Sequence, residues 1–366
     1  MNLRDVIKTI SEKFPIELVS ENDNVGLICG DYEDECSKMT VAYELNDRTL
    51  KEAGDLGSNL VVTYHTPIFK PVRNLTSSRE NFNPVLRAAR MSINVFTIHT
   101  ALDVMHGGIN WDFAERFGFK DTKFLSPLRS TLYKLVVFVP ASHLESVRKA
   151  ISLSGGGRIG DYSECSFDVA GNGTFIPGSA SNPFVGTRGK RESVEEERVE
   201  VVVEKQFLGR VIKGMVDAHP YEEVAYDVYP LVNESPNYGY GIVGNLEHPM
   251  DVNLFLGTVK RILSQPFVRV SHMSETEVTR VAFCAGSGMG FYGDAVGEGA
   301  DIFVTGDVRH HDFRTARSGK MVLVDASHSG TERYAPALIQ KALKELFTDK
   351  VDVTLARSQE DNAVIV

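Results

Sequence analysis

Segments typical of strands and of helices alternate along the chain, and this alternation constrains the fold more than any other feature of the sequence. Apolar residues at helical spacing predict a first helix over residues 3–14. Strand and helix patterns then follow one another over residues 39–45, 47–53, 59–64, 82–89, 93–98 and 110–117. Because such alternation is typical of a sheet covered by helices, we expect an α/β domain.

The pattern restarts near Tyr133 and predicts a second kind of unit. The expected order is strand, helix, hairpin, strand, helix and strand, over residues 135–139, 142–152, 165–175, 199–203, 207–218 and 224–229. Two β-α-β halves in succession favour a ferredoxin-like α+β unit. The α/β alternation resumes after residue 240 and ends in one long helix over residues 329–346. We therefore expect one α/β domain built from residues 1–128 and 235–366, with residues 129–234 inserted into it.

Charge and cysteine content exclude several classes of protein. The net charge of −10 argues against a general surface for nucleic acid or an anionic membrane, because phosphate binding depends on Lys and Arg. The 366 residues contain four cysteines without a Cys-x-x-Cys pair, which favours a reducing compartment. There is no signal or transit pattern, and no apolar run approaches the ~20 residues of a membrane span. We expect a soluble cytoplasmic protein of two or three domains, with the basic residues 188–191 in a solvated mixed-charge loop.

Three predicted strands are each followed by residues that can bind a metal. These residues are His65 after the first strand, His99 and Asp103 after the second, and His328 and Glu332 after the third. Ligands bind outside the carboxyl ends of strands in α/β sheets, so these side chains can converge there. His328 and Glu332 are four residues apart, which places them on one helix face. Taken singly, each residue also fits a structural role, as a buried hydrogen-bonded histidine or a helix cap.

Histidines with carboxylates, without cysteine partners, suit Zn²⁺, Mn²⁺ or Fe²⁺. Two such ions about 3.5–4 Å apart, bridged by a carboxylate, form a hydrolytic site. His310 and His311 are a further candidate, but adjacent helical residues point ~100° apart, so at most one can face a site. The glycine-rich residues 284–290 lack the P-loop and dinucleotide-binding spacings and predict a tight strand-to-helix turn. Cys29 is expected to pack in the core.

Several ordered motifs at both ends of the chain resemble the Nif-three-like family, whose bacterial members are often catalogued as GTP cyclohydrolase 1 type 2 homologues. The motifs are Asp23-Asn24-Val25-Gly26-Leu27, Tyr64-His65-Thr66-Pro67-Ile68-Phe69, His99-Thr100-Ala101-Leu102-Asp103, Thr305-Gly306-Asp307 and His328-x-x-x-Glu332. The middle of the chain, including residues 134–140, 160–167 and 219–227, resembles the inserted domain of the longer members. That insert is similar to the PII and CutA proteins, ferredoxin-like units that tend to trimerise.

The resemblance implies a two-metal site in a ring-shaped homohexamer. It maps His65, Asp103, His328 and Glu332 onto the metal ligands, with Glu332 as the bridge. Many members have His-His where this chain has Tyr64-His65, so a ligand to the second metal is missing or replaced by a phenol. We expect His310 or His311 to supply the missing nitrogen. The alternative is a weaker or empty second position.

Two classes of function remain open from the sequence. The first is a metal-dependent hydrolase of a nucleotide, with GTP suggested by the family label, or of another phosphorylated or cyclic small molecule. In this mechanism Glu332 holds the ions, and His99 or His310 moves protons. The second is a non-catalytic metal-binding, metal-delivery or regulatory protein, which a PII-like insert also fits.

Overall fold

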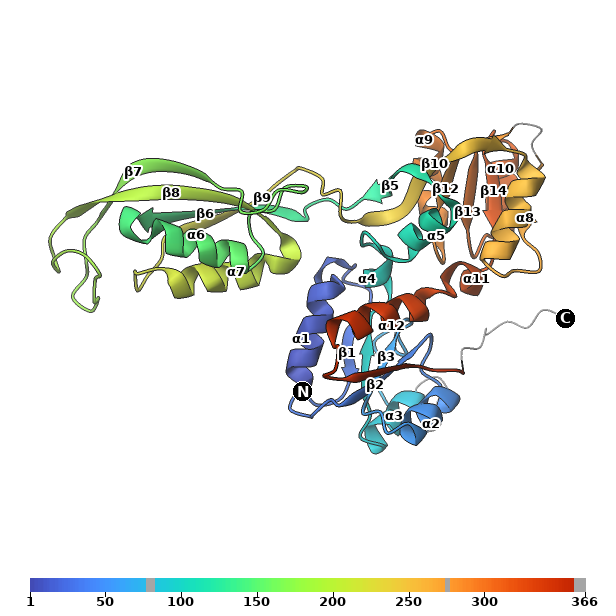
Figure 1. Cartoon of the computed structure of the whole chain (residues 1–366), viewed down its shortest axis with the longest axis horizontal. Coiled ribbons are helices and arrows are strands. Elements are labelled where there is room, and N and C mark those ends of the chain that lie inside the picture. The colour runs from blue at the N-terminus through green and yellow to red at the C-terminus, as the bar shows by residue number, and fades with distance from the viewer. Residues whose placement is uncertain (77–82, 274–276, 359–366) are drawn as a thin grey trace. The chain divides into compact units, whose positions relative to one another are not determined.

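The computed structural model describes residues 1–76, 83–273 and 277–358 (Figure 1). The chain forms two compact units. The larger unit combines Met1–Pro127 with Pro236–Val366, and the smaller unit is Leu128–Ser235. Within the described ranges, no helix is long and apolar enough to cross a membrane. The helix predicted over residues 82–89 begins at Phe82, which lies outside the described residues.

The first sheet of the larger unit has five strands in the order β1-β4-β3-β2-β15. Its strands are β1 (Gly26–Cys29), β2 (Lys38–Ala42), β3 (Leu60–Thr63), β4 (Asn94–Thr97) and β15 (Asp352–Leu355). All neighbouring pairs are parallel except β1 with β4. Every residue of β3 and β4 is buried. Strands covered on both faces need such continuous runs of core residues, which explains their sequence pattern.

The second sheet of the larger unit has six strands in the order β11-β14-β13-β12-β10-β5. Its strands are β5 (Lys120–Pro127), β10 (Gly239–Met250), β11 (Arg269–Val270), β12 (Val278–Phe283), β13 (Ile302–Thr305) and β14 (Val322–Asp325). The central strands β12, β13 and β14 are parallel. β5 and β10 pair antiparallel, and the smaller unit lies between them in the chain.

Both sheets contribute to one hydrophobic core. Val62 of the first sheet and Val304 of the second belong to the same cluster of buried residues. The helices that add side chains to it are α1 (Leu3–Lys13), α4 (Thr100–Asp103), α5 (Ile109–Phe117), α8 (Val252–Ile262) and α12 (Ala335–Leu346). The opposite faces are covered separately, the first sheet by α2 (Asp47–Asp55) and α3 (Asn83–Arg90). The opposite face of the second sheet is covered by α9 (Tyr292–Gly297) and α10 (His310–Arg317).

The smaller unit has a four-stranded antiparallel sheet with two helices. Its elements follow in the order β6 (Leu132–Pro140), α6 (Leu144–Leu153), β7 (Phe167–Phe175), β8 (Glu192–Glu204), α7 (Lys205–Ala218) and β9 (Tyr226–Pro230). The strand order is β7-β8-β6-β9. Alternate residues of β6 and β8, such as Val137 and Val201, pack against the apolar faces of both helices.

The structure corrects several sequence predictions. The single helix predicted over residues 329–346 is wrong, because α11 (His328–Glu332) ends before α12 begins. Pro336 lies in the first turn of α12, where a residue without an N–H is tolerated, whereas inside a continuous helix it would break a hydrogen bond. β1, β5, β10 and β15 were not predicted. β5 begins with exposed polar residues, and β10 carries glycines and an exposed end, so neither shows a clear strand pattern.

Candidate metal centre

The carboxyl ends of parallel strands from both sheets carry the polar residues of the site. In the first sheet Ala42, Thr63 and Thr97 lie in register, so β2, β3 and β4 end at the same level. Tyr43, Tyr64 and His99 come within two residues of these ends. In the second sheet, β13 and β14 end at the paired residues Thr305 and Asp325. Asp307 and His328 follow these two strands.

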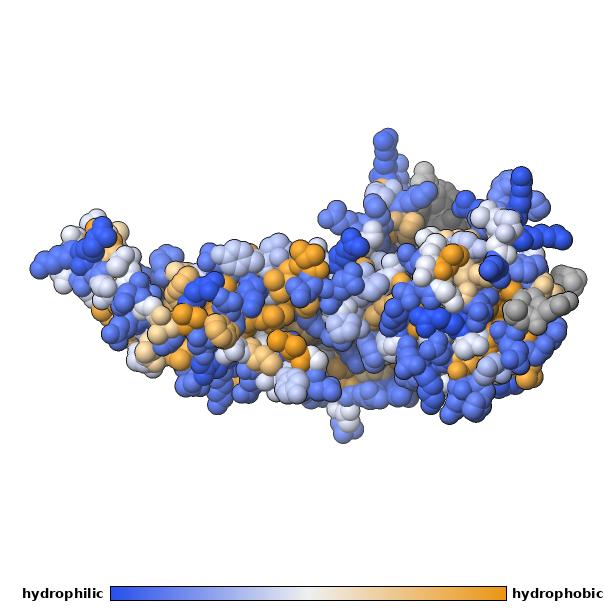
Figure 2. All heavy atoms as spheres, turned by 90° about the horizontal axis from the view of Figure 1, so that it is seen from above, coloured by the Kyte–Doolittle hydropathy of each residue, from blue (hydrophilic) through white to orange (hydrophobic). Residues whose placement is uncertain are grey.

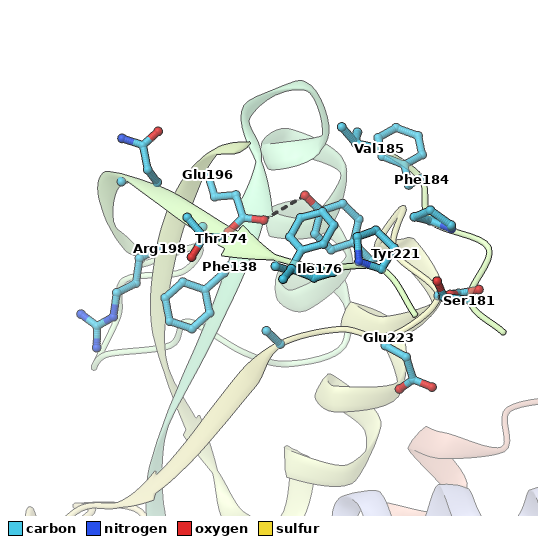
Figure 3. A pocket seen from close by; sticks show the side chains of 18 of the residues that line it. Phe138, Thr174, Ile176, Ser181, Phe184, Val185, Glu196, Arg198, Tyr221 and Glu223 are labelled. Atoms are coloured by element: carbon cyan, nitrogen blue, oxygen red, sulfur yellow. Dashed lines mark hydrogen bonds between the residues drawn. The ribbon is translucent and has the colours of Figure 1, made fainter. Parts of the chain in front are cut away.

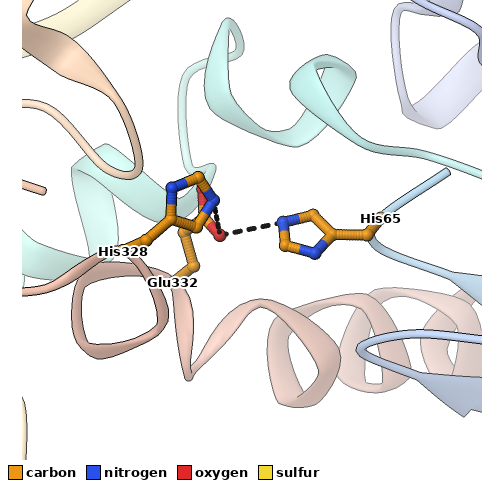
Figure 4. Close-up of side chains that lie close together, drawn as sticks. All are labelled: His65, His328 and Glu332. Carbon is orange, nitrogen blue, oxygen red and sulfur yellow. Dashed lines mark hydrogen bonds and ion pairs between the residues drawn. The ribbon is translucent and has the colours of Figure 1, made fainter. Parts of the chain in front are cut away.

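His65, His328 and Glu332 form a compact group of possible ligands (Figure 4). One ligand atom from each residue lies within 4.8 Å of the others. Glu332 Oε2 is 3.0 Å from His65 Nε2 and 3.1 Å from His328 Nε2. Glu332 is only 4% exposed, and its place one turn after His328 on α11 aims both side chains at His65. The group therefore joins the two sheets through one buried carboxylate.

Further side chains hold each member of this group from behind. Glu44 Oε1 lies 3.1 Å from His65 Nδ1, and Asp307 Oδ2 lies 2.8 Å from His328 Nδ1. The Tyr43 hydroxyl donates a hydrogen bond of 2.8 Å to Glu332 Oε2. A carboxylate on one ring nitrogen of a histidine fixes the ring and leaves the other nitrogen for a metal. Both histidines have this arrangement, with Nε2 directed at Glu332.

The charges in the group depend on one another. Burial by itself would lower the pKa of His65, but hydrogen bonds to Glu332 and Glu44 raise this pKa to about 9. The hydrogen bond to Glu332 raises the pKa of His328 to about 9 against the effect of burial. Burial opposes the charge on Glu332, yet its two histidine partners lower the pKa of Glu332 to about 2. The pocket thus keeps an ionised carboxylate between two groups that each present a positive charge.

A second set of polar residues adjoins the first. The Tyr64 hydroxyl donates a hydrogen bond of 2.8 Å to Asp103 Oδ1. His99 Nδ1 lies 2.6 Å from Asp23 Oδ1. Burial and the charge of Glu332 raise the pKa of Asp103 to about 7, and burial next to Asp103 raises the pKa of Tyr64. Asp103 is therefore close enough to Glu332 for their charges to interact.

The backbone around the site is strained at three residues that are not glycine. His99, Asp307 and Ser327 have φ values of 43°, 54° and 62°. Such left-handed conformations cost about 1–3 kcal/mol each and concentrate at functional sites. Gly286 also has a positive φ of 61°, and a Cβ atom there would lie 2.3 Å from Glu332 Oε1. Only glycine lets this turn pass so close to the carboxylate.

A cavity of about 460 Å³ opens beside His65. Its walls combine polar and apolar side chains: Glu44, Leu45, His65, Thr66, Pro67, Phe69, Pro84 and His99. The ring of Phe69 meets His99 edge-on at 6.3 Å between centroids. A small molecule in this cavity would lie within reach of both the His65 ring and the His99 ring.

The side chains present fit a divalent transition metal. Two imidazole nitrogens and a carboxylate oxygen already point at one another, and these are ligands that Zn²⁺, Mn²⁺ and Fe²⁺ accept. The additional carboxylates on the histidines are the supports that such sites use. No thiolate belongs to this group. The donor chemistry therefore fits a metal that prefers nitrogen and oxygen ligands.

Other predicted site residues lie outside the His65–His328–Glu332 group. His310 and His311 are exposed at the start of α10, with their rings 5.7 Å apart. Tyr64 makes a hydrogen bond to Asp103, and His99 makes one to Asp23. That His310 or His311 supplies the missing nitrogen ligand of the second metal stays a prediction. Sequence reasoning passed over Tyr43 and Glu44, although both follow a strand end just as His65 does, and it named Asp307 only within a family motif, without a role.

Comparisons with known proteins place this geometry in context. The family model described as Duf34/NIF3 (NGG1p interacting factor 3) matches residues 1–363. A "GTP cyclohydrolase 1 type 2 homolog" of Halalkalibacterium halodurans is 35% identical over 350 residues, covering 95% of this chain and 94% of that protein. Its counterpart in Bacillus subtilis is 31% identical over 362 residues, covering 99% and 97%. A solved Bacillus cereus protein related to NIF3 has a TM-score of 0.87 at 33% identity, covering 100% of this chain and 99% of that one.

Proposed function

The chain belongs to the Duf34/NIF3 family, and from that premise we propose that it is a metal-dependent hydrolase of a nucleotide or a related small molecule, with two divalent metal ions at the carboxyl ends of its strands. The observation that carries the proposal is the sharing of Glu332 Oε2 between the Nε2 atoms of His65 and His328. A buried carboxylate between two imidazoles is a costly arrangement unless charges balance it. A divalent metal ion held by these three side chains would supply the balancing charge in place of the histidine protons.

His65, His328 and Glu332 would hold the first ion, and Asp103 with Glu332 as the bridge would hold part of the second. Bound divalent ions would supply an activated water and polarise the atom under attack. Tyr43 keeps the Glu332 carboxylate in one orientation through its hydrogen bond. Glu44 and Asp307 keep Nε2 of both histidines directed at the site.

His99 is the proposed proton carrier. It lines the cavity beside His65, and its Nδ1 is tied to Asp23. A histidine held by a carboxylate on one nitrogen can exchange a proton with substrate through the other. Asp23 also accepts a hydrogen bond from the Thr100 hydroxyl, which fixes the carboxylate behind the ring. The names of the relatives make GTP the first substrate to test.

The smaller unit supports a second candidate, a regulatory or metal-delivery protein without turnover. Its β-α-β-β-α-β order and its strand order β7-β8-β6-β9 fit a ferredoxin-like unit of the PII/CutA kind. Many large apolar side chains of this unit are exposed, including Tyr162 and Phe167. A contiguous exposed apolar surface marks an interaction site, so these side chains support self-association, and the homohexamer itself rests on the family resemblance. Four free cysteines support a cytoplasmic location.

The first test is metal content per chain, measured by plasma mass spectrometry after loading with Mn²⁺ or Zn²⁺. The wild type is expected to hold close to two ions, and Glu332→Ala to lose both. Glu298→Ala is the control, because that carboxylate pairs with Lys123 and Arg280 away from the ligand group. One ion would indicate that Tyr64 has weakened the second position. Equal metal content in wild type and Glu332→Ala would contradict the site.

Turnover on a nucleotide panel separates the two candidate functions. Release of product from GTP or another nucleotide by the metal-loaded wild type, and its loss in His99→Gln, would support the hydrolase. Tight metal binding without hydrolysis of any nucleotide would favour the regulatory or delivery protein.

A further inference from the structure

The sheet of the smaller unit has one face without helices, and this face carries a hollow. Val199 and Val201 on β8 point toward α6 and α7. Side chains alternate along a strand, so Glu196 and Arg198 point to the opposite face. Phe138 on β6 and Val169 on β7 both pair with Arg198, which places all three side chains in one row across this open face.

Residues 176–185 pass beside this face and close a cavity of about 660 Å³ (Figure 3). Its apolar walls include Phe138, Phe175, Ile176, Phe184 and Tyr221. Phe184 is 51% exposed although it is a large aromatic side chain. Figure 2 shows apolar patches on the smaller unit, at the left of the view. The volume lies in the range of about 300–1,000 Å³ that is usual for small-molecule pockets.

Two glycines on β7 contribute to the depth of the pocket. Gly171 pairs with Glu196 across the strands, and a Cβ atom added at Gly171 would meet nothing within 4 Å. A Cβ atom at Gly173 would instead lie 2.1 Å from the Glu196 carboxylate. Gly171 therefore borders empty space, whereas Gly173 makes room for the Glu196 side chain.

The charged lining of the pocket is mostly acidic. Glu196 accepts a hydrogen bond of 2.9 Å from the Tyr221 hydroxyl, and Glu222 accepts one of 2.7 Å from the Asn182 N–H. Glu223 is a third carboxylate of the lining. Among the lining residues, all of which the structure describes, Arg198 is the one Lys or Arg, and its guanidinium pairs with Glu200. The pocket consequently has an excess of negative charge next to aromatic surface.

We propose that this pocket binds a small organic cation that carries an aromatic or branched apolar group. The faces of Phe138, Phe184 and Tyr221 can cover the apolar body of such a ligand and attract its positive charge. Glu196, whose carboxylate lies beside the Tyr221 ring, can pair with the ammonium group, and Glu223 adds negative charge to the lining. An anion of the same shape would meet unfavourable charge, so the chemistry of the pocket selects the sign of the ligand as well as its size.

The test measures binding of 2-phenylethylammonium to the full chain by calorimetry or ligand-observed NMR. 3-Phenylpropionate, an anion with a similar apolar body, is the matched ligand. The cation is expected to bind with a dissociation constant at least about tenfold lower, a difference equal to ~1.4 kcal/mol. Equal binding of both ligands would overturn the role of the carboxylates.

Two variants locate the binding site. Gly171→Leu fills the empty space beside Glu196 and is expected to abolish binding, with an unchanged circular dichroism spectrum. Gly209→Leu is its control, because a Cβ atom at Gly209 on α7 also meets nothing within 4 Å but lies outside the pocket lining. Glu196→Gln is expected to weaken binding of the cation several-fold and to reduce its dependence on salt.

Two further results would overturn the proposal. One is wild-type affinity of Gly171→Leu for the cation. The other is absence of cation binding to the wild type together with a lower molar mass of Gly171→Leu in light scattering, which would assign the pocket to contact with a second copy of the chain.

Discussion

Glu332 Oε2 lies 3.0 Å from His65 Nε2 although 267 positions separate the two residues in the chain. His65 follows β3 of the first sheet, and Glu332 lies on α11 after β14 of the second. The contact therefore depends on both sheets ending at the same place. Because the carboxylate is buried and faces two histidines, any change that moves it should alter metal binding more than it alters the fold.

Tyr43→Phe should weaken metal binding with little loss of stability. The change removes only the hydroxyl that donates to Glu332 Oε2, while the ring still packs 4.5 Å from His65 between centroids. Loss of such a supporting contact typically lowers metal affinity about 10–100-fold. Competition with a coloured chelator measures the affinity. Tyr292→Phe, on α9, is the control, and an unchanged affinity in Tyr43→Phe would show that Glu332 needs no support from this hydroxyl.

Gly286→Ala should reduce metal content in addition to destabilising the fold. Alanine is strained at a φ of 61°, and its Cβ would lie 2.3 Å from Glu332 Oε1, so the carboxylate has to move. Gly299→Ala separates the two effects, because Gly299 has a φ of 70° with nothing within 4 Å of the added Cβ. Both variants should lose about 1–2 kcal/mol of unfolding free energy from the backbone. Only Gly286→Ala should lose metal; equal metal content in both would contradict the contact.

Part of the site could be predicted from sequence because the residue types are diagnostic. His65, His328 and Glu332 each stand out as a histidine or carboxylate shortly after an apolar run. Tyr43 and Glu44 occupy the same kind of position after β2, but a tyrosine and a glutamate are common at strand ends for other reasons. Their roles depend on which sheet faces which, and that pairing is fixed by contacts distant in sequence.

The alternation of strands and helices could likewise be predicted, whereas the division into two sheets could not. α8 shows why, because the Asp251 side chain caps its first turn and its apolar residues recur at helical spacing, two signals that are local in sequence. β10 was missed because its exposed end and its glycines give no continuous apolar run. Since β10 pairs with both β12 and β5, missing it hides the second sheet.

His219 should make the stability of the smaller unit depend on pH. Its side chain is 7% exposed, with Nε2 3.0 Å from the Phe138 carbonyl and Nδ1 accepting the Tyr221 N–H. Burial lowers the pKa of His219 from its usual 6.5, so folding favours the neutral ring. The stabilisation is complete above pH 6.5 and is lost as the pH falls through the lower pKa of the folded protein.

Thermal unfolding between pH 8 and pH 5 measures this effect. The difference in melting temperature between wild type and His219→Gln should shrink as the pH falls. His248→Gln, which changes an exposed histidine of the larger unit, should show a constant difference from the wild type. A constant difference for His219→Gln as well would show that this ring keeps the same charge in the folded and unfolded chains.

Tyr64→Phe distinguishes a phenol that binds metal from one that supports Asp103. The Tyr64 hydroxyl donates to Asp103 Oδ1 at 2.8 Å, and burial together with the nearby Asp103 charge raises the pKa of Tyr64, so the neutral phenol is favoured. A neutral phenol is a poor metal ligand, so we expect the variant to keep the number of bound ions of the wild type. It should instead lose about 1–3 kcal/mol of unfolding free energy, because the buried Asp103 loses a hydrogen-bond donor.

Metal content and denaturant unfolding of Tyr64→Phe, measured on the same preparation, give both quantities. A loss of one ion per chain at unchanged stability would make Tyr64 a ligand of the second metal.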